Sequence, residues 1–246
     1  MVFCKKHAYG NGGNQLKYKK LVSAGCSFIH GSELGDENPY SHKTYPALLS
    51  KHLNLQYDCV AYPGASNQGI VKQIFDYDIS EDCLFLIQWT FPWRMGVDLS
   101  YLYTNEKKQK QTWFDLAPNH WQLQGKFDGQ VDEQLDLESC SNNLKMLGVD
   151  QLNEQVYKHL GNDRHLNFYT RLCVLAIQQY LHANHCKFVF TAGVNSVAKL
   201  PYVVSFENLG FKEWCEKKKF KLGPYKHPLD EAHHSAFEYL CNILNI

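Results

Sequence analysis

The chain has 246 residues, of which 44% are apolar and 20% charged, as is usual for a soluble globular protein with one large domain or two small ones. Its 25 basic and 25 acidic residues balance, which argues against broad binding to nucleic acid or to an anionic membrane. The nine cysteines are scattered and form no Cys-x-x-Cys pair, which favours reduced thiols. The start of the chain has no signal-peptide core, and no apolar run is long enough to span a membrane, so we expect a cytoplasmic location.

The chain opens with a lead-in that is followed by a strand, a helix and a second strand. Residues 1–17, where glycines are spaced among polar side chains, are expected to be poorly ordered. The apolar run at 18–24 predicts a strand, and residues 41–53 carry apolar side chains at helical spacing. A second short strand is expected at 55–61.

A second helix, a buried strand and a long polar segment come next. Ser66 is a typical cap for a helix that ends near Phe75. Residues 82–89 form a nearly continuous apolar run, as expected of a strand that a parallel sheet buries on both faces. The segment 95–150 is polar and shows no clear period. We interpret it as an insertion that covers the candidate site and not as a separate domain.

Regular periodicity returns in the last third of the chain. Residues 163–183 predict a long helix with Asp163 as its cap. Its apolar stripe is expected to contain Leu172, Leu175, Ala176 and Tyr180. Residues 187–192 predict a strand, and residues 230–244 an amphipathic closing helix. Strands that alternate with helices indicate a single α/β domain over residues 1–246, with a parallel sheet covered on both faces.

The stretch 21–31 reads Leu-Val-Ser-Ala-Gly-Cys-Ser-Phe-Ile-His-Gly and carries the strongest functional signal. An apolar run ends in Gly-Cys-Ser, which would deliver Ser27 to the carboxyl edge of the sheet, where open α/β sheets bind ligands. The turns after the second and third strands should meet at the same edge. A nucleophilic serine needs a base and oxyanion donors. Gly64 offers an unhindered backbone N–H, and the Asn67 side chain a second donor.

The base must be a histidine from elsewhere in the chain, and two candidates lie near the C-terminus. His227, followed by proline, lies on the loop before the last helix. His233, one turn into that helix, is the alternative base. His233 and His234 are adjacent on a helix and do not easily face one ion, so we expect no metal site.

Thr90, Trp93 and Arg94 follow the third strand and are candidates for substrate binding. The planar guanidinium of Arg94 suits a carboxylate or a phosphate, and a surface salt bridge is an equally good interpretation. Trp93 fits a core or cleft-wall position better than a platform for sugar stacking. Cys26 adjoins Ser27, but adjacent side chains at a strand end point in opposite directions, so a buried, structural Cys26 is the better interpretation.

The ordered set of motifs resembles the SGNH (GDSL-like) hydrolase superfamily. The set comprises Gly-x-Ser after the first strand, a glycine turn after the second and a late His-Pro before the final helix. The resemblance implies a flavodoxin-like three-layer α/β/α sandwich with a central parallel sheet of about five strands. It also implies ester cleavage without a cofactor. It assigns Ser27 as the nucleophile, Gly64 as the oxyanion glycine and His227 as the base.

The chain departs from the family pattern in three places, and the Gly-Cys-Ser-Phe opening resembles a divergent SGNH-like branch. Cys26 stands in place of the aspartate of Gly-Asp-Ser. The third motif, Gly-x-Asn-Asp, is absent, so Asn67, Thr90 or Arg94 would have to supply its oxyanion donor. Pro224 occupies the position of the aspartate that orients the histidine. Candidates for that role are Asp36, Asp230, Glu231 and a backbone carbonyl.

We therefore expect a serine esterase that removes a small acyl group, such as acetyl, from a carbohydrate or another small-molecule ester. Two alternatives stay open. The missing asparagine and aspartate would suit a catalytically degenerate binding module on the same fold, and an acyltransferase would use the same site. The expected partner is a small-molecule or carbohydrate ester, without nucleic acid or membrane.

Overall fold

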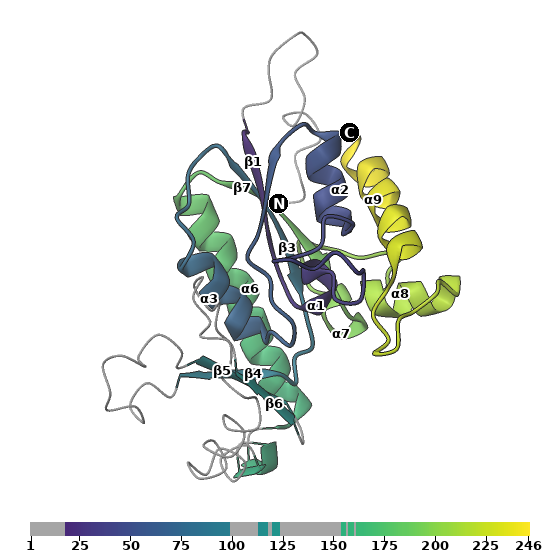
Figure 1. The fold of residues 1–246 in the computed structure, drawn as a ribbon. Coiled ribbons are helices and arrows are strands. Elements are labelled where there is room, and N and C mark those ends of the chain that lie inside the picture. The colour runs from purple at the N-terminus through teal and green to yellow at the C-terminus, as the bar shows by residue number, and fades with distance from the viewer. Residues whose placement is uncertain (1–17, 99–112, 118–119, 124–153, 156, 160) are drawn as a thin grey trace, which may run out of the picture.

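A five-stranded parallel sheet lies at the centre of the molecule, with helices on both faces (Figure 1). The structure is a computed structural model and describes residues 18–98, 113–117, 120–123, 154–155, 157–159 and 161–246. The strands are β1 (Lys20–Ala24), β2 (Gln56–Cys59), β3 (Cys83–Trp89), β7 (Lys187–Ala192) and β8 (Val203–Val204). Their order is β2-β1-β3-β7-β8, and each neighbouring pair is parallel. This is the flavodoxin-like order, so the predicted three-layer sandwich is confirmed.

The two central strands are apolar because the sheet is covered on both sides. Leu21 and Val22 of β1 are both fully buried although they point to opposite faces. β3 buries six of its seven residues, which explains the continuous apolar run in the sequence. The edge strand β2 is more polar, because its side chains are only partly covered.

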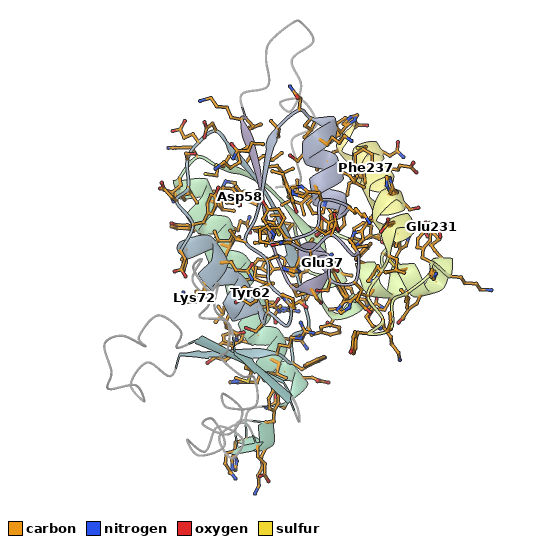
Figure 2. The ribbon with its side chains drawn as sticks, viewed as in Figure 1. Glu37, Asp58, Tyr62, Lys72, Glu231 and Phe237 are labelled. Atoms are coloured by element: carbon orange, nitrogen blue, oxygen red, sulfur yellow. The ribbon has the colours of Figure 1, made fainter. Side chains whose placement is uncertain are left out.

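Two pairs of helices cover the two faces of the sheet (Figure 1). They are α2 (Tyr45–His52), α3 (Asn67–Phe75), α6 (Asp163–Ala183) and α9 (Asp230–Leu244). The helices α2 and α9 pack together on one face, and α3 and α6 on the other. Phe237 of α9 lies toward α2, where its ring centroid is 5.6 Å from that of His52 (Figure 2). The bounds of α6, α9 and β7 agree with the predicted ranges, whereas α2 begins later than predicted, after Thr44.

Further helices lie at the carboxyl end of the sheet and beyond it. They are α1 (Ser27–His30), α7 (Asn195–Ala198) and α8 (Phe211–Lys218). Figure 1 shows α1 at the lower end of β1, between the two helical layers. The sequence does not predict α7, which has four residues, or β8, which has two, because such short segments show no periodicity.

The long helix α6 faces the core with a different stripe from the predicted one. Its buried residues include Cys173, Val174 and Ile177, whereas Leu172 is 44% exposed and Leu175 48% exposed. Its cap is the Asn162 side chain, which accepts from the His165 N–H, and not Asp163. The helix carries apolar residues on two faces, so helical spacing alone could not decide which of them is buried.

A second, antiparallel sheet falls within the predicted insertion 95–150. It contains β4 (Met95–Asp98), β5 (Trp113–Ala117) and β6 (His120–Leu123) in that order. Figure 1 shows it beyond the lower end of the main sheet, near α3 and α6. The remainder of the insertion and the lead-in 1–17 lie outside the described residues. The prediction that the insertion covers the site therefore stays a prediction.

Three further properties concern the described part of the chain. Its seven cysteines are free thiols, and all but Cys241 are buried. No helix in it is long and apolar enough to cross a membrane. In the same residues, no three or more His, Cys, Asp and Glu side chains gather closely enough to hold a metal ion.

Candidate active site

Ser27 is the first residue of α1, directly beyond the carboxyl end of β1. Gln73 of α3 fixes the turn before it through two hydrogen bonds. The Gly25 N–H donates to Gln73 Oε1 at 2.9 Å, and Gln73 Nε2 donates to the Gly25 carbonyl at 3.0 Å. Only 5% of Ser27 is exposed. The turn therefore holds the serine rigidly at the sheet edge, as the sequence predicts.

His227 is oriented by Glu33, a residue that the sequence interpretation did not single out. His227 Nδ1 lies 2.6 Å from Glu33 Oε2. The same carboxylate accepts from the backbone N–H groups of Tyr225, at 3.0 and 3.1 Å, and of His227, at 3.2 Å. Burial alone would raise the pKa of Glu33, but these donors outweigh it and lower the pKa, so the carboxylate stays ionised.

None of the carboxylates considered from the sequence is seen to contact His227 among the described residues. Asp230 forms an ion pair with Lys43 at 3.5 Å, and Asp36 accepts from the His42 N–H at 3.1 Å. Glu231 is exposed at the start of α9 (Figure 2). The sequence left open which group orients His227, and in the structure Glu33, three residues before Asp36 in the loop after α1, takes that position. A signal for Glu33 did exist, since it follows the Ser27 motif by half a dozen residues.

The ring of Phe28 connects the histidine to the serine motif. Phe28 follows Ser27 in α1, and its ring centroid is 5.9 Å from that of His227, with the rings edge to face. Phe28 also contacts Phe211, at 6.1 Å, and so anchors this part of α1 in the core. His227 and Glu33 consequently lie beside the helix that begins with Ser27.

His233, the alternative base, lies in the hydrophobic core. Its side chain is fully buried, and its Nδ1 accepts from the Tyr45 N–H at 3.3 Å. Its ring stacks on that of Tyr45 and contacts that of Phe211. Burial lowers the pKa of His233 to about 3. A fully buried, neutral ring that supports the backbone of α2 is not offered to a substrate, which argues against this candidate.

Asn67 connects two turns at the sheet edge and has no amide hydrogen left for an oxyanion. Its Nδ2 donates to the Thr90 carbonyl at 3.1 Å and to Thr170 Oγ1 at 3.0 Å. Its Oδ1 accepts from the Thr90 N–H at 2.9 Å. Both amide hydrogens are used, so the expected role as donor is corrected to a structural one.

The turns predicted to converge do meet at one edge. Thr90 Oγ1 donates to Cys26 Sγ at 3.4 Å, which joins the turn after β3 to that after β1. Cys26 is fully buried, in agreement with a structural role. Gly64, in the turn after β2, has a φ of 81°, a left-handed conformation that favours glycine. Ser27 and Gly64 thus both lie in turns that follow neighbouring strands at one edge of the sheet.

Arg94 lies over two aromatic rings at the same edge. Its guanidinium carbon is 4.8 Å from the Phe91 ring centroid and 5.4 Å from that of Trp93. Its Nη1 donates to the Ala65 carbonyl at 3.3 Å. Among the described residues, no Asp or Glu forms an ion pair with Arg94. Trp93 is 38% exposed, so it is not a core residue.

No protein-family model matches the chain, and no curated protein matches it in sequence. Several solved structures resemble it. A carbohydrate esterase, described as having an active site with divergent catalytic and non-catalytic binding functions, has 13% identity and a TM-score of 0.44, over 92% of this chain and 68% of that one. An acetyl xylan esterase from the rumen bacterium Butyrivibrio proteoclasticus has 11% identity and a TM-score of 0.42, over 93% and 65%.

A third similar structure is a putative lipolytic protein of the G-D-S-L family from Desulfitobacterium hafniense DCB-2. It has 12% identity and a TM-score of 0.35, over 92% of this chain and 99% of that one. With identities and TM-scores this low, the activities of these proteins cannot be assigned to this chain. The site has to be judged from its own geometry.

Proposed function

We propose that the protein is a serine esterase of SGNH type with a Ser27, His227 and Glu33 triad. The observation that carries the proposal is the 2.6 Å contact between His227 Nδ1 and Glu33 Oε2 beside α1. It supplies the carboxylate that the sequence motif lacks. In this proposal Ser27 is the nucleophile, His227 the base and Glu33 the group that orients the base.

Glu33 sets the tautomer of His227. Because Glu33 is ionised, its Oε2 accepts the Nδ1–H of the imidazole, and Nε2 is left as the proton acceptor. In the proposed reaction, Ser27 Oγ attacks the acyl carbonyl while His227 Nε2 takes its proton. The protonated histidine then gives this proton to the leaving alcohol. Water, activated by the same histidine, releases the acid and restores Ser27.

The oxyanion of the tetrahedral intermediate needs donors that are fixed before the reaction. We assign this role to the backbone N–H groups of Gly64 and Ser27, since the Asn67 amide is committed to Thr90 and Thr170. The turn before Ser27 is held by buried hydrogen bonds to Gln73, and in the turn of Gly64 the Ala65 N–H donates to the Tyr62 carbonyl while the Ala65 carbonyl accepts from Arg94. No cofactor takes part in this chemistry.

The proposed substrate is a small acyl group, such as acetyl, on a carbohydrate or another small-molecule ester. The motif resemblance supports this class. The binding-module alternative loses one of its two reasons, because Glu33 now provides a carboxylate for His227. An acyltransferase would use the same residues and differ only in the acceptor of the acyl group.

Labelling with a fluorophosphonate, which reacts with activated serines, tests the proposal. We expect the wild type to be labelled and the Ser27→Ala variant not to be. Ser32→Ala, a serine just beyond the same short helix, is the matched control and should be labelled as the wild type is. Labelling that persists in Ser27→Ala, or a folded wild type that neither reacts nor cleaves 4-nitrophenyl acetate, would overturn it.

A further inference from the structure

We propose that the ester substrate carries an anionic oxygen group, a carboxylate or a phosphate, and that Arg94 binds this group next to the reacting ester. The inference rests on the proposed esterase function and narrows its substrate class. It starts from the position of Arg94 at the sheet edge and from the observation that no Asp or Glu among the described residues pairs with its charge.

Arg94 is tied to the turn that carries the proposed oxyanion donor. Its Nη1 donates to the carbonyl of Ala65, the residue that follows Gly64. Ala65 is itself fully buried, so this anchor does not move with the surface. The guanidinium therefore lies at the same edge of the sheet as Ser27. It contacts the residue next to Gly64, whose N–H is proposed to bind the oxyanion.

The guanidinium is held in a fixed orientation before any ligand arrives. It lies over the rings of Phe91 and Trp93, and the Tyr157 hydroxyl donates to the Trp93 carbonyl and so helps to fix this loop. Cation–π contacts of this kind stabilise a charge without using its hydrogen-bond donors. An arginine has five N–H donors, and Ala65 occupies one of them. Within the described part of the chain no other acceptor is seen for Arg94, so its other N–H groups are available as a planar fork.

The charge of Arg94 has no acidic partner in the described part of the chain, although its side chain is half-buried. Lys43, on the other hand, pairs with Asp230 at 3.5 Å and also donates to the Leu34 carbonyl at 2.8 Å. Partial burial of a cation is unfavourable unless a counter-charge compensates it. A stacked, half-buried guanidinium without a carboxylate is therefore complementary to an anion supplied from outside.

A carboxylate and a phosphate share the chemistry that Arg94 recognises, which is a pair of oxygens that accept two parallel N–H bonds. The test compares the hydrolysis of three acetyl esters of similar size. Methyl 4-acetoxybenzoate is neutral, 4-acetoxybenzoate carries a carboxylate, and 4-acetoxyphenyl phosphate carries a phosphate. For each ester, kcat/KM is measured with the wild type, Arg94→Gln, Arg94→Lys and the control Arg171→Gln, an exposed arginine of α6.

We expect Arg94→Gln to lower kcat/KM for at least one anionic ester by roughly tenfold to a hundredfold, and for the neutral ester by less than about threefold. For Arg94→Lys, kcat/KM with the anionic ester should lie between the values of the wild type and Arg94→Gln, because lysine keeps the charge but lacks the planar pair of donors. Arg171→Gln should resemble the wild type. The anionic ester with the larger loss identifies carboxylate or phosphate as the group that is bound.

The inference is overturned if Arg94→Gln lowers kcat/KM equally for neutral and anionic esters, or leaves all of them unchanged, while the wild type is active. If the wild type cleaves no ester and Ser27 is not labelled, the proposed function fails instead. Binding of 4-hydroxybenzoate and phenyl phosphate, followed by Trp93 fluorescence, then decides about Arg94 separately. If the wild type and Arg94→Gln bind these two anions with equal affinity, Arg94 does not form an anion site.

Discussion

At the scale of single residues, the proposed catalytic role of His227 depends on the negative charge of Glu33. Replacing Glu33 by glutamine keeps the size of the side chain but removes the charge, and it allows the wrong imidazole tautomer. We expect Glu33→Gln to lower kcat by about 10²- to 10⁴-fold. Steady-state hydrolysis of 4-nitrophenyl acetate measures this. A kcat within threefold of the wild type would mean that Glu33 has no part in orienting the base.

Gly223 keeps the space in which the Glu33 carboxylate lies. A Cβ atom at position 223 would lie 2.6 Å from Glu33 Cδ and 2.7 Å from both carboxylate oxygens. The flexible carboxylate can move away, so Gly223→Ala should keep the fold but displace Glu33 from His227. We expect kcat to fall at least tenfold while the thermal midpoint shifts by only a few degrees.

The matched control for that variant is Tyr225→Ala. The Tyr225 side chain is 82% exposed, and its contribution to the site is the backbone N–H that donates to Glu33. Alanine keeps this N–H, so activity should stay near that of the wild type. Equal losses in Gly223→Ala and Tyr225→Ala would show that the loop as a whole, and not the carboxylate position, governs activity.

At the scale of elements, Asn67 fixes the turn after β3 to the start of α3. Asn67→Ala removes three buried hydrogen bonds and leaves the Thr90 N–H without its partner. A buried donor without a partner costs on the order of 1–3 kcal/mol, so we expect a loss of that size in the free energy of unfolding. Urea denaturation measures it. Unchanged stability with a hundredfold lower kcat would instead return Asn67 to the role of oxyanion donor.

The elements that the sequence predicted well are those with a clear period or an uninterrupted apolar run. α6, α9 and β7 have the predicted bounds, and the strand before Ser27 delivers it to the sheet edge. The buried stripe of α6 could not be predicted, because the exposed Leu172 and Leu175 are three residues apart, as are the buried Val174 and Ile177. Periodicity identifies a helix, and the neighbouring elements decide which face is covered.

Side-chain pairing at the site was harder to predict than the site's position. Gly-x-Ser after a strand indicates where Ser27 lies, since the strand direction and the crossover rule fix the edge. Glu33 meets His227 across 194 positions of the chain, through a loop residue with a φ of 72°. The position of Glu33 shortly after the Ser27 motif makes it a candidate, but no local pattern shows that its side chain reaches His227. Asn67 likewise has a side chain suited to an oxyanion, and only the structure shows that Thr90 and Thr170 already occupy it.

At the scale of the whole molecule, the buried His233 makes folding depend on pH. Burial lowers the pKa of its imidazole to about 3 in the folded protein, whereas an unfolded chain has a value near 6.5. Below about pH 6.5 the unfolded chain therefore binds a proton that the folded protein does not. The free energy of unfolding should fall as the pH falls from about 6.5 toward 3, by at most about 1.4 kcal/mol per pH unit.

Urea denaturation at pH 7 and pH 5 isolates this contribution. The His233 term predicts a stability loss of about 2 kcal/mol over this interval. His233→Asn keeps an acceptor for the Tyr45 N–H but does not titrate, so its loss between the two pH values should be smaller by about that amount. His234→Asn, the exposed neighbour on the same helix, should retain most of the wild-type dependence. If all three proteins lose stability equally, the pH dependence between pH 7 and pH 5 arises from other groups, and His233 does not control it.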